Sequence, residues 1–166
     1  MTKYASRITA GSFFEGNGEF LPFKRDSFDL VYCHYLLLLV PDPVNILKEM
    51  RRVLCPGGIC AAMAEPCYSD MTAEPEALRK LAELQREHLI SEGIDPAIGR
   101  NLMDHFQKAG FTQIESTEYQ QCEQTEKYLK TEIRQMAEDT GTEMYILKDG
   151  EKAYYNVPTY YAFAVK

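Results

Sequence analysis

The sequence predicts an α/β fold in which helices cover both faces of a sheet. Three observations predict it. Apolar, β-branched and aromatic residues fill 28–35, as in a central strand buried on both faces. Apolar side chains then recur at helical spacing over 46–54. A Pro-Gly-Gly turn at 56–58 ends that helix, and a strand of small apolar residues follows over 59–64.

The remaining elements can be placed by the same signals. Residues 8–15 form a candidate strand, which the glycines at 16 and 18 end. The leucines at 36–39 either extend the strand 28–35 or begin a helical turn. Asp42 suits an N-cap and Pro43 the first position of the helix that follows. We expect further helices near 74–91, 98–109 and 123–138, and further strands over 111–120 and 159–165.

Composition favours one domain with a real core, because the chain has 166 residues of which 45% are hydrophobic. The net charge of −7 argues against a nucleic-acid partner, which needs a basic surface. The longest apolar run, 36–40, falls far short of the roughly 20 residues of a transmembrane helix. The N-terminal residues lack the apolar core of a signal peptide. We therefore expect no nucleic-acid and no membrane partner.

The five cysteines form no Cys-x-x-Cys pair, and several lie in apolar segments. This pattern predicts reduced, buried thiols in a cytoplasmic protein. The histidines at 34, 88 and 105 lack the spacing of metal ligands, so no metal site is expected.

Ligands of open α/β sheets bind beyond the carboxyl ends of the strands. The predicted strands place 16–19, 33–39 and 65–70 on that rim. A ligand site is therefore expected where these three segments meet.

Four consecutive segments resemble one family. They are Gly16–Phe23 (GNGEFLPF), Ser27–Val31 (SFDLV), Leu38–Pro43 (LLVPDP) and Leu47–Gly58 (LKEMRRVLCPGG). Their order and spacing resemble the class I S-adenosylmethionine-dependent methyltransferases, in particular the UbiE-like branch (methyltransferase type 11). The resemblance covers about 13–65. It implies a Rossmann-like methyltransferase sheet, S-adenosylmethionine as cofactor and a small-molecule methyl acceptor.

The chain departs from the family pattern at its start. The family is expected to carry an acidic-x-Gly-x-Gly loop after its first strand and an acidic ribose ligand after its second, and neither is found. Glu15-Gly16-Asn17-Gly18 spells the first motif superficially, but 20–23 (FLPF) follows it instead of a helix. We therefore assign 16–19 to the loop after the family's third strand. The expectation is an incomplete sheet in a single truncated domain over 1–166, with 66–110 as a lid on the acceptor side.

The resemblance also implies site residues. Asn17 falls where the family often has an Asp that binds the adenine amino group, and Gly18 would lie against the adenine. Asn17 can also be a turn residue only. His34 and Tyr35 fall just after the fourth strand, near the methionine moiety and the acceptor. His34 can alternatively be a strand-end residue bonded to backbone.

Other candidate residues lie near the acceptor. Glu65 and Tyr68, in the loop after the strand 59–64, are expected to face the substrate, although Glu65 can also simply solvate that loop. An aromatic core is favoured over a substrate cavity for Tyr154, Tyr155 and Tyr160. Cys33 is not expected to be a nucleophile, because no basic neighbour is evident that would lower its pKa.

Three functional hypotheses remain. The chain is a methyltransferase whose cofactor loop is supplied by another chain or lies outside this sequence, a self-associating binding module that has lost the cofactor, or a fragment without an independent role. Without the family's first two strands, the apolar strand 28–35 would lie at a bare sheet edge. Bare apolar edges pair with other chains, so we expect a homodimer.

Overall fold

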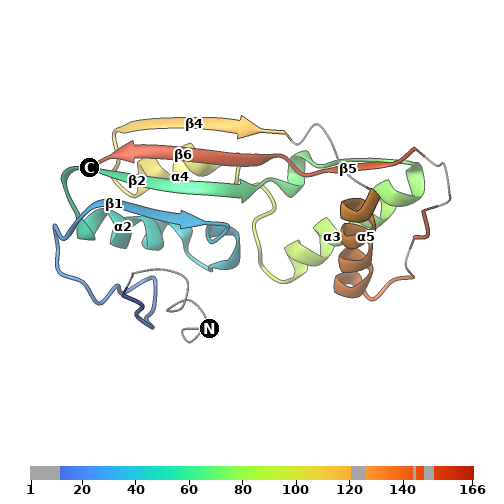
Figure 1. The fold of residues 1–166 in the computed structure, drawn as a ribbon, viewed down its shortest axis with the longest axis horizontal. Helices are drawn as coiled ribbons and strands as arrows, with labels where there is room; N and C mark the ends of the chain where they lie inside the picture. The colour runs from blue at the N-terminus through green and yellow to red at the C-terminus, as the bar shows by residue number, and fades with distance from the viewer. Residues whose placement is uncertain (1–11, 121–125, 144, 148–151) are drawn as a thin grey trace.

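The computed structural model describes residues 12–120, 126–143, 145–147 and 152–166. Figure 1 shows the arrangement of its elements. The strands are β1 (Phe28–His34), β2 (Leu54–Pro66), β3 (Thr72–Glu74), β4 (Gln113–Tyr119), β5 (Tyr154–Asn156) and β6 (Thr159–Val165). The α-helices are α2 (Pro43–Val53), α3 (Glu76–Ser91), α4 (Leu102–Lys108) and α5 (Glu126–Thr140), and two 3-10 turns are η1 (Leu37–Leu39) and η2 (Tyr68–Asp70).

Four strands form the main sheet in the order β1-β2-β6-β4. β1 runs parallel to β2, and α2 forms the crossover between them. β6 is antiparallel to both β2 and β4. The expected α/β class and Rossmann-like sheet are confirmed. β3 and β5 form a separate antiparallel pair that the sequence patterns did not indicate.

Both α2 and α4 pack on the same face of this sheet. One core joins Leu47 of α2 and Phe106 of α4 to small residues of the strands, such as Cys60 and Ala162. In the described residues we find no second helical layer of the kind that the sequence led us to expect. Apolar side chains on the opposite face consequently remain in solvent.

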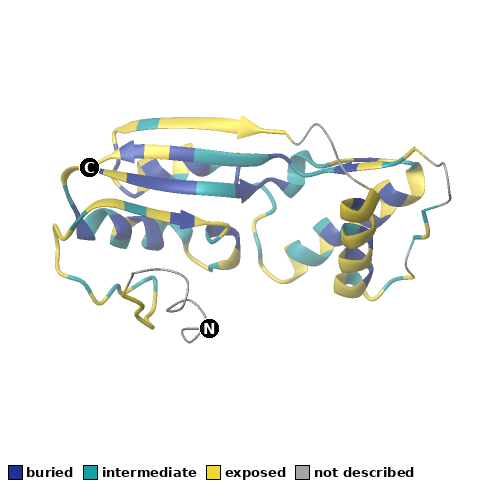
Figure 2. Ribbon diagram, in the orientation of Figure 1, coloured by how far each residue is buried: buried dark blue, intermediate teal, exposed yellow. Residues whose placement is uncertain are grey.

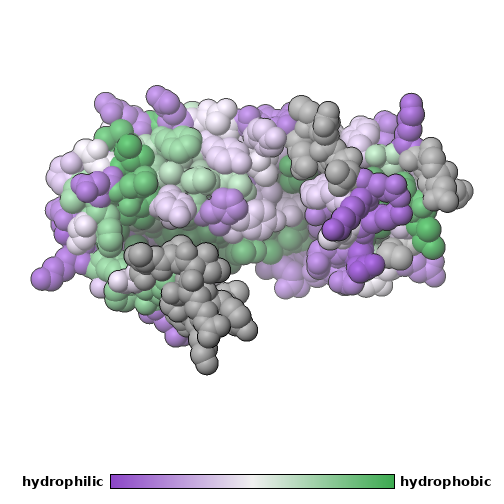
Figure 3. Space-filling model, in the orientation of Figure 1, coloured by the Kyte–Doolittle hydropathy of each residue, from purple (hydrophilic) through white to green (hydrophobic). Residues whose placement is uncertain are grey.

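That uncovered face carries two rows of paired residues. Leu30, Ile59 and Val165 lie in register across β1, β2 and β6, and Tyr32 and Phe163 lie two residues further along. Tyr32 is 62% exposed and Leu30 56% exposed. Figure 3 shows hydrophobic residues gathered over the sheet. We call these five residues the bare sheet face.

β1 forms one edge of the sheet, since within the described ranges it pairs with β2 alone. The other edge, β4, is polar, and nearly all of its residues are exposed (Figure 2). Of the strand expected over 8–15, residues 8–11 lie outside the described residues and 12–15 have no regular structure. The only β contact described for this part of the chain is one bridge between Asn17 and Phe20.

Local sequence explains the βαβ unit that leads to the rim. The Asp42 carboxylate accepts the backbone N–H of Asn45 at 2.9 Å, and Pro43 opens α2, as expected. After α2, Gly58 allows β1 and β2 to approach closely. A Cβ there would lie 3.0 Å from the Asp29 carbonyl oxygen, which is too close for another residue.

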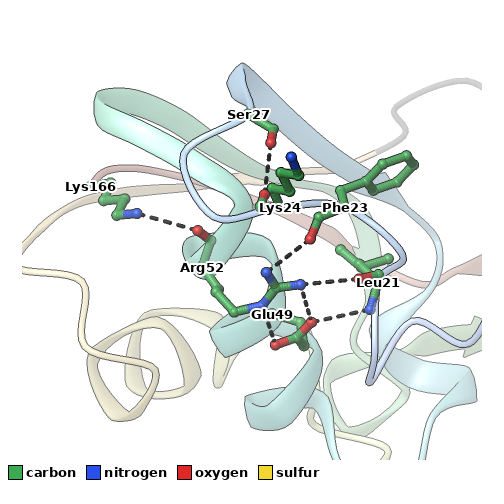
Figure 4. A network of polar contacts seen from close by, with 7 residues as sticks. All are labelled: Leu21, Phe23, Lys24, Ser27, Glu49, Arg52 and Lys166. Atoms are coloured by element: carbon green, nitrogen blue, oxygen red, sulfur yellow. Dashed lines mark hydrogen bonds and ion pairs between the residues drawn. The ribbon is translucent and has the colours of Figure 1, made fainter.

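A polar network ties the segment before β1 to α2 (Figure 4). The Glu49 carboxylate accepts the Leu21 N–H at 3.1 Å and two N–H groups of Arg52. Arg52 in turn donates to the carbonyl oxygens of Phe23 and Leu21 at 2.9 and 3.0 Å. The hydrogen bonds from Arg52 are the main reason that the pKa of Glu49 lies below its usual value.

A second core lies beyond the carboxyl end of β2, where α3 and α5 pack with β3 and β5 (Figure 1). Its buried residues include Leu78, Leu129, Met136 and Tyr155. α3 belongs to the 66–110 segment that we expected to form a lid. α4 belongs to the same segment but covers the main sheet. The lid assignment for the whole of 66–110 stays a prediction.

Candidate functional site

The candidate site lies where β1 and β2 end side by side. The chain leaves β1 through Tyr35, whose backbone is left-handed with φ of +50°, and then forms η1. The Glu65 carboxylate, at the end of β2, accepts the N–H groups of Leu36 and Leu37 at 2.8 and 3.1 Å and that of Leu38 at 3.3 Å. Since Glu65 is 0% exposed, these hydrogen bonds fix the loop after β1 to the end of β2.

This geometry gives Glu65 a structural role. Its oxygens are occupied by backbone donors, and it is not among the residues that line the cavity described next. The proposed contact between Glu65 and a substrate stays a prediction that this arrangement does not favour.

A cavity of about 210 Å³ opens beside the same loop. The Tyr35 and Tyr68 hydroxyls are 3.0 Å apart at its wall. β4 and α5 contribute the other aromatic groups. We call this cavity the tyrosine pocket; its lining is Tyr35, Pro66, Tyr68, Tyr119, Tyr128, Glu132, Val157 and Thr159.

Burial, with a smaller contribution from Glu132, determines the electrostatics of the tyrosine pocket and its surroundings. Burial raises the pKa of this carboxyl above its usual value. Burial also raises the pKa of the Tyr68, Tyr128 and Tyr155 hydroxyls, and the negative charge of Glu132 adds to each of these shifts. The phenol groups therefore stay protonated and neutral around a single carboxylate.

A second polar cluster borders the pocket. The Asp70 carboxylate is paired with Arg100, and it accepts hydrogen bonds from Cys67 Sγ at 3.0 Å and Tyr160 Oη at 3.3 Å. Tyr160 also donates to Glu118 at 3.2 Å. These contacts hold η2 against β6 and β4, so they fix the position of the turn that carries Tyr68.

The three tyrosines near the C-terminus for which an aromatic core was favoured lie in different environments. Tyr155 is buried in the second core, where its hydroxyl donates to Gln85 at 2.7 Å. Tyr160 is part of the Asp70 cluster. Tyr154 is exposed and lies outside the tyrosine pocket.

Asn17 and Gly18 lie in a tight turn. The Asn17 side-chain oxygen accepts the Glu19 N–H at 2.9 Å, and the Phe20 N–H donates to the Asn17 carbonyl at 3.0 Å. Gly18 lies against α2, because a Cβ there would be 3.0 Å from Ile46 Cδ1. A role as turn residue is thus sufficient to explain the local hydrogen bonds of Asn17.

The structure brings together only part of the predicted site. Tyr35, Glu65 and Tyr68 meet at the rim. His34 is exposed at the end of β1, directly before Tyr35 in the sequence. Asn17 makes its described hydrogen bonds within its own turn. The roles proposed for these residues stay predictions.

Sequence reasoning missed the pocket residues on β4 and α5. Tyr119 is the last residue of a strand that ends near the rim, and Tyr128 and Glu132 are four residues apart on one helix face. That i, i+4 pair was the available signal. It could not be placed because nothing in the sequence says that α5 returns to the end of β1.

The structure gives little support to a cysteine nucleophile or a metal site at the rim. Burial raises the pKa of the Cys33 thiol to about 12, so Cys33 is protonated at neutral pH and is no nucleophile. In the part of the chain that the structure describes, no cluster of three or more His, Cys, Asp or Glu side chains could hold a metal ion. None of the described helices has the length and apolar character to cross a membrane.

Comparisons with known proteins extend these findings. The methyltransferase domain family matches residues 1–62. The demethylmenaquinone methyltransferase of Lactococcus lactis subsp. lactis is 33% identical over 116 residues, which are 62% of this chain and 46% of that protein. That of Bacillus velezensis is 49% identical over 53 residues, which are 31% of this chain and 23% of that protein. The chain thus spans less than half the length of either relative.

The fold is similar to that of solved structures, a methyltransferase among them. The YcgJ protein of Bacillus subtilis superposes with a TM-score of 0.63 at 16% identity, over 99% of this chain and 76% of that chain. The phosphoethanolamine N-methyltransferase 2 of Haemonchus contortus, solved with phosphomonomethylethanolamine and S-adenosylhomocysteine, superposes with a TM-score of 0.53 at 16% identity, over 90% of this chain and 36% of that chain. At these identities the likeness concerns the fold.

Proposed function

Since the chain belongs to the class I S-adenosylmethionine-dependent methyltransferases, we propose that it takes part in methyl transfer to a small-molecule acceptor and that the cofactor site is incomplete in this chain alone. The observation that carries the proposal is the rim itself. The loop after β1 adjoins a small cavity, while β1 is left without a strand on its outer side in the described residues. Ligands of such sheets bind at this end of the strands.

The described residues fit S-adenosylmethionine in part. Gly18, His34 and Tyr35 would form one wall of its site, with Asn17 at the adenine. The Asn17 oxygen already accepts the Glu19 N–H, but an amide oxygen has two lone pairs and can accept a second donor. In the described part of the chain, no strand pairs with the outer side of β1, where a strand carrying a cofactor-binding glycine loop would lie. The cofactor, when bound, supplies an electrophilic methyl group.

The residues of this chain would orient the acceptor. Glu65 holds the 36–38 backbone, and that loop positions Tyr35 at the pocket wall. Tyr68 is held from the other side by its hydrogen bond to Tyr35. Alignment of the acceptor and exclusion of water are the contributions that methyl transfer requires from such a pocket. The pocket volume suits a small acceptor or one end of a larger one.

Calorimetric titration of S-adenosylmethionine and then S-adenosylhomocysteine into the purified chain tests the proposal. We expect no saturable heat for the chain alone at ligand concentrations up to about 1 mM, which corresponds to a binding free energy weaker than about −4 kcal/mol. Stoichiometric micromolar binding would contradict incompleteness. In that case Asn17→Ala should weaken binding if the adenine assignment is right, whereas Glu15→Ala, outside the turn contacts, should not.

A second candidate function is self-association without catalysis, and the bare sheet face favours it. In a symmetric dimer, two β1 strands would pair antiparallel about a two-fold axis normal to the sheet. Centred on Val31, this pairing places Leu30 opposite Tyr32 of the partner subunit, and the two apolar pairs extend the bare sheet face across the dimer. Light scattering after size exclusion distinguishes a dimer from the 19.0 kDa monomer. A monomer at about 100 μM would refute this function.

A further inference from the structure

We propose that the tyrosine pocket binds a small organic cation, and that the acceptor of the proposed methyl transfer is an amine that binds there in its protonated form. Its nitrogen must lose this proton before it can accept the methyl group, and the Glu132 carboxylate is the base among the lining residues that can take it. The inference deepens the proposed function and rests on it only for calling the ligand an acceptor. Binding of the cation can be tested without any cofactor.

The first argument is the composition of the lining. Four of the eight lining residues are tyrosines, contributed by the loop after β1, by η2, by β4 and by α5. One carboxylate, Glu132, completes the wall, and no Lys, Arg or His is among the lining residues. Electron-rich aromatic rings and a carboxylate attract an ammonium group, and the lining holds no positively charged side chain that would attract an anion.

The second argument is the state of Glu132. It is half-buried, and no ion pair of this carboxylate is found in the described residues. By contrast Glu126, on the same helix, is exposed and paired with Lys130. Burial without a counter-charge raises the pKa of Glu132. A cation in the pocket would supply the missing charge and stabilise the ionised form.

The third argument is geometric. The Tyr35 and Tyr68 hydroxyls are in mutual contact at 3.0 Å, and the charge of Glu132 acts on the hydroxyls of Tyr68 and Tyr128. Tyrosines from three separate elements therefore line one cavity together with one carboxylate. Phenol oxygens accept hydrogen bonds from the N–H groups of a protonated amine, while a quaternary ammonium relies on the rings.

The size of the cavity restricts the cation. A volume of about 210 Å³ is smaller than the pockets that enclose drug-sized ligands. It accommodates a headgroup such as trimethylammonium with a short chain. Tyr119, one of the lining residues, is itself 59% exposed, so we expect a longer tail to project outward past its ring.

A matched pair of probes separates charge from shape. Choline and 3,3-dimethylbutan-1-ol have nearly the same shape, and only choline is charged. We expect choline to bind the chain with one site and at least tenfold more tightly than the neutral alcohol, as measured by calorimetry at constant ionic strength. Equal affinities, or no choline binding at 20 mM, would overturn the proposal.

Variants locate the binding. Glu132→Gln should weaken choline binding at least tenfold, whereas Glu138→Gln, an exposed position on the same helix, should leave it unchanged. Tyr119→Thr should weaken it several-fold, and Tyr154→Thr, an exposed strand tyrosine outside the pocket, should not. Circular dichroism confirms that each variant is folded. Binding that survives both pocket substitutions would place the cation elsewhere and refute the assignment.

The same experiment separates this inference from the proposed function. In one outcome, choline binds in a way that depends on Glu132 while S-adenosylmethionine does not bind, even in the presence of a second chain that supplies the missing glycine loop. That result would exclude the methyltransferase role and keep the cation site. Loss of the choline signal with intact cofactor binding would remove only the cation site.

Discussion

At the residue scale, the hydrogen bonds accepted by Glu65 hold the loop after β1 in place. Its buried carboxylate accepts three backbone N–H groups, whereas the amide introduced by Glu65→Gln would offer one acceptor oxygen and turn a donor toward the other N–H groups. We expect this substitution to lower the free energy of unfolding by about 2 kcal/mol, because a buried donor loses its partner. Urea unfolding followed by circular dichroism measures the change. Glu115→Gln, exposed on β4, is the control and should have almost no effect.

Glu49 gives a second residue-scale prediction, which concerns pH. Its pKa is lowered in the folded chain, mainly by the hydrogen bonds from Arg52. The resulting stabilisation is present above the unfolded pKa of about 4.3 and is lost as pH falls through the lower folded pKa. Wild type should therefore be about 1 kcal/mol more stable than Glu49→Gln at pH 7.

Thermal unfolding of both proteins from pH 7 down to pH 3 checks the sign. The two melting temperatures should converge below about pH 4, since protonated Glu49 then resembles the amide. A difference that grew as pH fell would contradict this account of the network in Figure 4.

The residues of the site could be predicted only where their position next to a predicted strand placed them at the rim. Tyr35 and Tyr68 follow predicted strands, and the rule that ligands bind at strand ends brought them to one rim. Glu65 was expected in the loop after its strand, whereas it lies inside β2, and sequence could not show that its carboxylate faces the 36–38 backbone. Glu132 was out of reach, because it joins the pocket through the packing of α5 on α3.

At the element scale, β1 and β4 are sheet edges of opposite character. β4 carries exposed polar residues such as Glu115 and Glu118, which discourage pairing with another strand. β1 exposes Leu30 and Tyr32 instead. If β1 mediates self-association, Tyr32→Lys should abolish the dimer while leaving the monomer folded. Thr117→Lys, on the polar edge, should leave the dimer intact; a dimer that persists in Tyr32→Lys would exclude this interface.

The elements were largely predictable where local signals were strong. The cap at Asp42 and the helix that it starts were confirmed. A strand was confirmed over Phe28–His34, but in the described residues it is a sheet edge with one exposed face and not the central strand, buried on both faces, that its composition indicated. The short β3 and β5 strands were missed because three residues carry too little periodicity. The uncovered face was also missed, since an α/β pattern predicts helices without saying on which side of the sheet each one packs.

At the scale of the whole molecule, an exposed apolar face couples folding to association. Any partner that binds only the folded state stabilises it by mass action. If the dimer forms through β1, raising the protein concentration from about 1 to 100 μM should raise the melting temperature by several degrees. Tyr32→Lys should melt at one temperature throughout that range. The measurement is thermal unfolding followed by circular dichroism in cells of different path length. Dye-based scanning fluorimetry is unsuitable, because its dye binds exposed apolar side chains of the folded protein. A wild-type melting temperature independent of concentration would show that two copies of this chain do not pair through β1.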